Sequence, residues 1–200
     1  MPRRLKPLVF CLCLIPAAVL VYNGVMGRLG ANPIEAITRF TGDWTLYFLL
    51  MTLAVTPLRR LTGYTPVMRY RRMLGLYAFF YATLHFLTYL VLDQFFDWGA
   101  IAKDIMKRPY ITVGFTAFVL LIPLAVTSTT RMMQRLGRKW RKLHRLVYVI
   151  GCLGILHYLW LVKLDIRDPV LFGLVFIAFM LLRLPRPRPP AKSPLMRSSS

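Results

Sequence analysis

Six long apolar stretches, separated by charged segments, dominate the pattern of hydrophobic and polar positions. They cover approximately residues 8–26, 43–58, 73–92, 110–129, 144–162 and 169–184. A helix needs about 20 apolar residues to cross a hydrocarbon core of about 30 Å. The pattern therefore predicts an all-α integral membrane protein, folded as a six-transmembrane-helix bundle in one domain that covers residues 1–184.

Two segments outside these stretches differ from them in character. Residues 93–109 mix aromatic and aliphatic side chains such as Phe95 and Trp98 with charged ones, which is typical of an amphipathic segment at the membrane surface. Residues 185–200 are rich in proline, arginine and serine, and they contain too few apolar residues to bury a core. We expect them to form a disordered cytoplasmic tail.

The net charge of +20 is divided unequally between the two predicted sides of the membrane. With alternate loops on opposite sides, one side carries 20 of the 27 basic residues and the other carries all seven acidic residues. Because basic loops stay in the cytoplasm, both termini are predicted to be cytoplasmic. Such alternation is not expected of a nucleic-acid-binding protein. We therefore predict that the chain is embedded in membrane lipid and does not bind nucleic acid.

Three cysteines, Cys11, Cys13 and Cys152, all fall inside the predicted spans. No C-x-x-C-H sequence is present for covalent haem attachment, and no cysteine pair has the spacing of a zinc or iron–sulfur site. We interpret these cysteines as small apolar residues.

The three histidines, His85, His144 and His157, lie in or at the end of predicted spans. Ionisable side chains inside a membrane are costly and usually have a function. Neutral imidazole is the common axial ligand of a buried haem iron, which makes these residues candidate ligands. The alternative is that each histidine is hydrogen-bonded to a neighbouring helix.

Depth in the membrane favours the pair His85 and His157. His85 lies 12 residues beyond Met73, where the third stretch begins, and His157 lies 13 residues beyond His144, where the fifth begins. At 1.5 Å per residue, both lie roughly 18–20 Å from the cytoplasmic end of their helices. Two imidazoles at one level on parallel helices are predicted to hold the iron of one b-type haem.

An inner centre near His144 is a second prediction, and its nature stays open. His144 lies about 20 Å below His157, and the third stretch offers Arg71 and Arg72 at that height in place of another histidine. Arginine is a poor iron ligand but binds haem propionates or a flavin phosphate well. The inner centre is therefore a second haem with one protein histidine, a flavin, or absent. On a straight helix His144 and His157 would point in different directions, since 13 residues rotate by about 220°.

Three segments carry a resemblance to a known family. They are Arg71–His85 (RRMLGLYAFFYATLH), Trp140–Tyr148 (WRKLHRLVY) and Leu156–Trp160 (LHYLW). They resemble the haem-binding membrane subunit of the bacterial protein-methionine-sulfoxide reductase system, the MsrQ or YedZ family of the ferric-reductase-like transmembrane superfamily. The resemblance covers nearly the whole chain.

The resemblance implies a multi-pass protein of the bacterial inner membrane that binds haem b and, in some members, FMN. Such proteins take electrons from the quinone pool or a cytosolic flavin reductase. They deliver them to MsrP, a periplasmic molybdopterin enzyme that reduces methionine sulfoxide in oxidised proteins. By position, His85 and His157 match the family's outer haem ligands and His144 its inner candidate. The superfamily's fourth histidine is missing, which leaves a second haem open.

Two other functions remain as alternatives. One is a self-contained membrane ferric or quinone reductase with the same architecture. The other is a cofactor-free transporter or assembly protein, in which the histidines relay protons or pack between helices. The sequence contains no glycine-rich dinucleotide-binding motif, so we expect that the chain does not itself oxidise NAD(P)H and that a partner carries out the substrate chemistry.

Overall fold

The structure is a computed structural model that describes residues 5–162 and 164–184, and within these ranges it is helical with no β-strand. The all-α class is thereby confirmed. The α-helices are α1 (Leu5–Val25), α2 (Pro33–Thr62), α3 (Arg71–Leu87), α4 (Trp98–Lys107), α5 (Pro109–Val126), α6 (Thr130–Leu136), α7 (Arg138–Leu143), α8 (Leu146–Leu161) and α9 (Arg167–Leu181). A 3-10 turn, η1 (Thr65–Arg69), precedes α3, and a π-helical segment, η2 (Thr88–Asp93), continues it.

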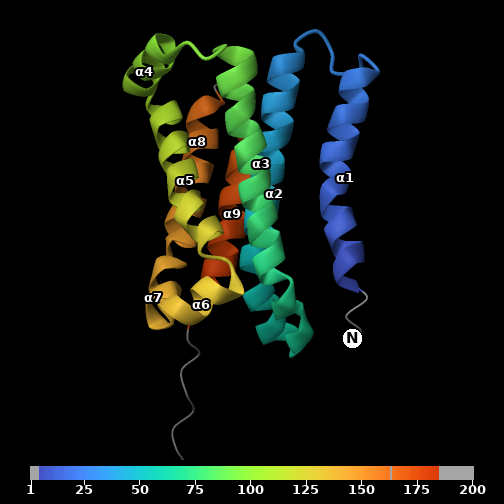
Figure 1. Ribbon diagram of the computed structural model, residues 1–200, viewed down its shortest axis with the longest axis vertical. Helices are drawn as coiled ribbons and strands as arrows, with labels where there is room; N and C mark the ends of the chain where they lie inside the picture. The colour runs from blue at the N-terminus through green and yellow to red at the C-terminus, as the bar shows by residue number, and fades with distance from the viewer. Residues whose placement is uncertain (1–4, 163, 185–200) are drawn as a thin grey trace, which may run out of the picture.

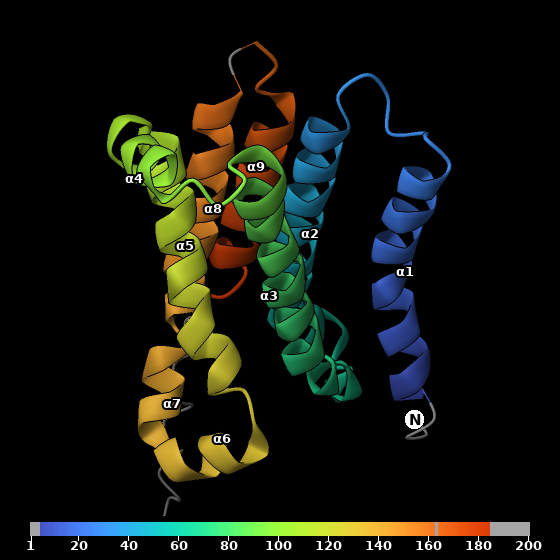
Figure 2. The ribbon, with the colours of Figure 1, turned by 45° about the horizontal axis from the view of Figure 1, so that its top comes forward.

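The long helices lie side by side, and the short ones cover the two ends of the bundle (Figures 1 and 2). Helix α3 packs along α2, and α8 packs along α5, while α1 stands at the edge against α2 and α3. Helix α4 lies across one end, which we call the acidic end because α4 and the loops beside it carry acidic residues. Helices α6 and α7 lie at the other, the basic end.

Four helical stretches in the described ranges are long and apolar enough to cross a membrane: Leu5–Val25, Arg71–Asp93, Pro109–Val126 and Arg138–Leu161. They correspond to four of the six predicted spans. The other two are also helical, but α9 has only 15 residues and the apolar part of α2 lies between charged residues, Asp43 and Arg59. The count of six spans and the side of the termini stay predictions, and the tail at 185–200 lies outside the described residues.

The helix boundaries differ from the predicted ones at two places that matter for the site. Helix α2 begins at Pro33 rather than near residue 43, because Asn32 caps it by accepting a hydrogen bond from the Glu35 N–H at 3.3 Å. Helix α8 begins at Leu146, so His144 lies in a break after α7 and not on α8 itself. The basic segment between the fourth and fifth apolar stretches forms two short helices, α6 and α7.

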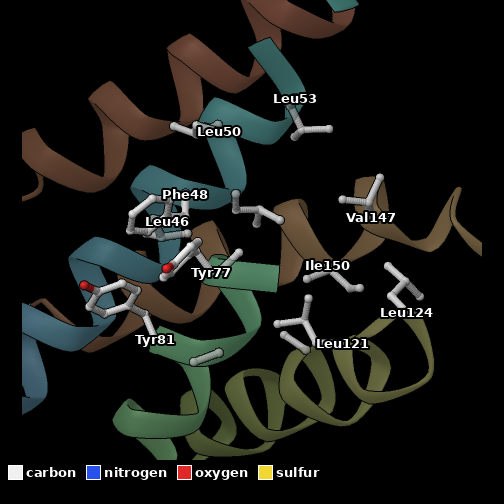
Figure 3. Close-up of a cluster of buried hydrophobic side chains, with 14 of the residues drawn as sticks. Leu46, Phe48, Leu50, Leu53, Tyr77, Tyr81, Leu121, Leu124, Val147 and Ile150 are labelled. Atoms are coloured by element: carbon white, nitrogen blue, oxygen red, sulfur yellow. The ribbon is translucent and has the colours of Figure 1, made fainter. Parts of the chain in front are cut away.

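The core is a cluster of aromatic and aliphatic side chains between α2, α3, α5 and α8 (Figure 3). The Phe48 ring stacks on both Tyr77 and Tyr81, with ring centres 5.5 and 5.2 Å apart. Hydroxyls of these tyrosines attach α1: Tyr77 donates to the Phe10 carbonyl oxygen at 2.9 Å, and Tyr81 to that of Cys13 at 2.9 Å. The core therefore holds α2 and α3 together in the half of the bundle that carries His85.

Candidate functional site

His85 of α3 and His157 of α8 face each other across the bundle. Their ring centres are 6.1 Å apart, and the ring planes are inclined by 81°. Both rings are half-buried, and both line the same two cavities. The structure thus brings together the two histidines that sequence analysis placed at one depth.

Each of these rings is held by a backbone carbonyl group of the helix packed behind it. Nδ1 of His85 lies 2.9 Å from the carbonyl oxygen of Thr38 in α2, and Nδ1 of His157 lies 2.7 Å from that of Tyr110 in α5. A carbonyl oxygen can only accept a hydrogen bond, so Nδ1 carries the proton and donates in both rings. The Nε2 lone pair of each neutral ring is then free to bind a metal ion.

The arrangement of donors fits a haem iron. If both imidazoles bound one iron ion through Nε2, two metal–nitrogen bonds of about 2 Å, plus the distance from each nitrogen to its ring centre, would separate the ring centres by about 6.2 Å, close to the observed separation. The adjoining cavities measure about 110 and 350 Å³ and are lined mainly by apolar side chains. No group of three or more histidine, cysteine or acidic residues in the described ranges could form another metal site.

Charged and aromatic residues at the acidic end line the larger of these two cavities. Asp93, Trp98 and Arg108 line it together with Ile101, the buried residue of α4. An ion pair of 3.3 Å joins Arg108 to Asp104 of α4. The amphipathic helix α4 thus contributes to the wall of the larger cavity, which His85 and His157 also line.

His144 occupies a different kind of site, near the basic end. Its ring stacks on Trp140 with ring centres 3.9 Å apart, its Nδ1 lies 3.2 Å from the Trp140 carbonyl oxygen, and its Nε2 lies 3.5 Å from Ser128 Oγ. It lines a cavity of about 490 Å³ together with the cations Arg69, Arg71, Arg72 and Lys6. No acidic residue in the described ranges lines this cavity.

The two arginines predicted for the inner centre differ in their hydrogen-bond partners. Arg72 donates from Nη1 to Thr130 Oγ1 of α6 at 3.1 Å, which ties it to the wall of the cavity. Arg71 also lines the cavity, and no hydrogen bond is found for its side chain among the described residues. Arg71 therefore has its guanidinium donors available for an anion.

Sequence analysis did not identify Gly42 and Gly114, which lie against the two facing histidines. A Cβ atom at Gly42 would lie 3.2 Å from His85 Cε1, and one at Gly114 would lie 2.6 Å from His157 Nδ1. Each glycine precedes its histidine by 43 residues. This equal spacing is the signal in the sequence that would have found them.

Comparison of the sequence with a family model and with known proteins points to one family. Residues 41–155 match the model of the family described as "Ferric reductase like transmembrane component". A protein of Herminiimonas arsenicoxydans is 57% identical over 183 residues, covering 90% of this chain and 84% of the relative. One of Rhodospirillum rubrum is 55% identical over 177 residues (88% and 85%), and one of Caulobacter vibrioides is 51% identical over 178 residues (88% and 85%).

All three relatives carry the name "Protein-methionine-sulfoxide reductase heme-binding subunit MsrQ". No solved structure matches the chain.

Proposed function

This chain belongs to the ferric-reductase-like transmembrane family and, within it, to the MsrQ heme-binding subunits, and from that membership we propose that it conducts electrons across a bacterial inner membrane. The electrons would come from the quinone pool or a cytosolic flavin reductase. They would go to a periplasmic molybdopterin-containing reductase of the MsrP type, which repairs methionine sulfoxide in oxidised proteins.

The observation that carries the proposal is the opposed pair of imidazoles, 6.1 Å apart with Nε2 free on both. In this proposal His85 and His157 hold the iron of one haem b. The bound haem supplies a centre that accepts and releases one electron at a time. The chain fixes the two rings, surrounds the centre with apolar side chains and leaves substrate chemistry to the partner.

We assign the inner cavity to a second centre, either a haem held by His144 or an FMN. The surrounding arginines, Arg71 and Arg72 among them, suit the propionates of the one or the phosphate of the other. The side chains of Leu49 and Leu121 line both the inner cavity and the smaller outer one. Only a thin layer of side chains therefore separates the two sites, as a two-step conduit requires.

The proposed topology has six spans with both termini in the cytoplasm. The contrast between the acidic and the basic end supports it, since basic loops are retained in the cytoplasm. In this orientation His85 and His157 lie toward the periplasm, within reach of a docked enzyme, and His144 lies toward the cytoplasmic donor.

Electron delivery in proteoliposomes tests the proposal. Vesicles with the protein and ubiquinol would receive a purified MsrP-type reductase and methionine sulfoxide. Oxidation of one quinol releases two electrons and two protons, which convert one sulfoxide to methionine and water. We expect methionine to form with the wild type and with Cys152→Ala, whose side chain is exposed, and not with His85→Ala or His157→Ala.

Two outcomes would count against the proposal. Methionine formation by the two histidine variants at the wild-type rate would contradict a role for the pair. Reduction of ferric citrate by the vesicles without any added reductase, together with no methionine formation when it is added, would favour a self-contained ferric reductase.

A further inference from the structure

We propose that Gly42 and Gly114 are positioning residues for the two facing histidines. Each glycine exposes the backbone carbonyl oxygen four residues before it. That oxygen accepts a hydrogen bond from Nδ1 of the opposing imidazole, which keeps the proton on Nδ1 and sets the orientation of the ring. The inference rests on the proposed function, in which His85 and His157 hold the iron of a haem.

The first of these sites lies on α2. In an α-helix the carbonyl oxygen of residue i−4 points toward residue i, so the side chain of residue i lies beside it. At Gly42 there is no side chain, and the His85 ring reaches the Thr38 carbonyl oxygen at 2.9 Å. A Cβ would approach His85 Cε1 to 3.2 Å and Nδ1 to 3.3 Å, so the ring would have to move by a few tenths of an ångström.

The second site, on α5, is built in the same way but is tighter. The His157 ring reaches the Tyr110 carbonyl oxygen at 2.7 Å. A Cβ at Gly114 would lie 2.6, 2.8 and 3.0 Å from Nδ1, Cε1 and Cγ of His157. These atoms belong to the ring itself, so the ring cannot stay in place if residue 114 has a side chain.

The two sites repeat each other in sequence. Each carbonyl group precedes its histidine by 47 residues, and each glycine precedes its histidine by 43. The same carbonyl, glycine and imidazole therefore recur 72 residues apart, once in the α2–α3 pair and once in the α5–α8 pair. Close helix packing alone would not require the hydrogen-bonding geometry to recur with the glycine.

His144 provides a contrast within the same chain. Its Nδ1 faces the carbonyl oxygen of Trp140 from its own segment, at 3.2 Å, and for none of the glycines in the described ranges is the His144 ring among the atoms that an added Cβ would meet. The glycine-exposed carbonyl is thus specific to the opposed pair.

The hydrogen bond has a defined effect on a ligand histidine. A carbonyl acceptor at Nδ1 holds the tautomer with a free Nε2, orients the ring and makes Nε2 a stronger electron donor to the metal. A stronger donor stabilises ferric over ferrous iron and so lowers the midpoint potential. Displacement of the ring by a Cβ should weaken the bond, raise the potential and change the ligand field.

The test compares four alanine variants of the full-length, haem-loaded protein in detergent. Gly114→Ala should bind haem about 10- to 100-fold more weakly, the usual cost of losing the group that orients a metal ligand, measured as haem transfer to apomyoglobin. Gly42→Ala, with the milder contact, should keep more haem and show a shifted low-spin ferric EPR signal and a raised midpoint potential.

Gly151→Ala is the control for a steric clash without a histidine, because its Cβ would lie 2.5 Å from Phe176 Cε2. It should lower thermal stability and leave the EPR signal and the potential at wild-type values. Gly173→Ala, whose Cβ would lie 3.7 Å from Ile155 Cγ2, should leave the thermal stability, the EPR signal and the potential at wild-type values. Alanine is also the better helix former, so lower helix propensity cannot explain a loss in any variant.

Two results would overturn the inference. One is a folded Gly42→Ala protein whose EPR signal and midpoint potential equal those of the wild type. This result would reject the inference even if Gly114→Ala does not fold. The other is an equal shift in Gly151→Ala. A wild-type protein without haem, or a His85→Ala protein with the full haem content of the wild type, would instead overturn the proposed function.

Discussion

Arg183, two residues after the end of α9, donates a hydrogen bond from Nη2 to the backbone carbonyl oxygen of Leu53 in α2, at 2.5 Å. Leu53 is completely buried, and its usual helical donor would be the backbone N–H of residue 57, which is proline and has none. The same guanidinium donates to the Tyr148 hydroxyl at 2.6 Å. One side chain therefore satisfies the acceptor left free by the proline and joins the turn that follows α9 to α2 and α8.

Replacement of this side chain by an apolar one of similar length should destabilise the bundle. In Arg183→Met the Leu53 carbonyl oxygen loses its donor in a buried position, which costs about 1–3 kcal/mol. We expect a lower midpoint of thermal unfolding in detergent, followed by circular dichroism.

Pro57→Ala supplies the matched control. It restores an N–H group that can donate to Leu53 within α2, so the loss caused by Arg183→Met should be much smaller in the Pro57→Ala background. Equal losses in both backgrounds would show that the hydrogen bond to Leu53 is not what Arg183 contributes.

The attachment of α1 makes a second prediction. The Tyr81 hydroxyl accepts from the Ala17 N–H at 3.1 Å and donates to the Cys13 carbonyl oxygen at 2.9 Å. Tyr81→Phe removes both bonds, which are worth about 0.5–1.5 kcal/mol each, so α1 should separate more often from α3. Cys13, which is 6% exposed, should then react faster with N-ethylmaleimide in a background lacking Cys11 and Cys152.

Tyr22→Phe is the control for this experiment, because Tyr22 is an exposed tyrosine of α1, the helix that carries Cys13. It should leave the rate of Cys13 labelling unchanged. A Tyr81→Phe protein that is labelled at the wild-type rate would mean that lipid or detergent contacts, and not the hydroxyl, hold α1 in place.

A third prediction separates the two inner arginines. Arg71 has its donors free toward the cavity, whereas Arg72 is tied to Thr130. If the cavity takes the phosphate of FMN, Arg71→Gln should weaken FMN binding about 10- to 100-fold, corresponding to the loss of a charge-assisted hydrogen bond. Arg72→Gln should weaken it less. Quenching of flavin fluorescence on titration measures both.

Arg131→Gln, an exposed position on α6, is the matched control for charge and should bind FMN as the wild type does. Equal weakening in all three variants would indicate a general effect of positive charge at the basic end. No FMN binding by the wild type would leave a haem as the candidate for the inner site.

The sequence predicted the opposed histidines because depth along a helix follows directly from residue spacing. His85 and His157 each lie 12 or 13 residues from the start of an apolar stretch, and that is enough to place them at one level. The acidic and basic ends could be predicted for a similar reason, since the alternation of loops needs no knowledge of packing.

What could not be predicted depends on which helices pack together and in which register. The roles of Thr38 and Tyr110 rest on backbone carbonyl oxygens, which no side-chain pattern reveals. The start of α2 was missed because its first turns are polar, although Asn32 and Pro33 carry a start signal. The argument from a straight helix does not apply to His144, because a two-residue turn separates α7 from α8 there.

The most direct test of the account is the absorption spectrum of the purified protein, oxidised and dithionite-reduced, with a pyridine-haemochrome count. The account predicts a b-type spectrum in the wild type, loss of the outer haem in both His85→Ala and His157→Ala, and retention of that haem in His144→Ala. A colourless wild-type protein from cells with adequate haem, or full haem content in the His85→Ala and His157→Ala variants, would contradict it.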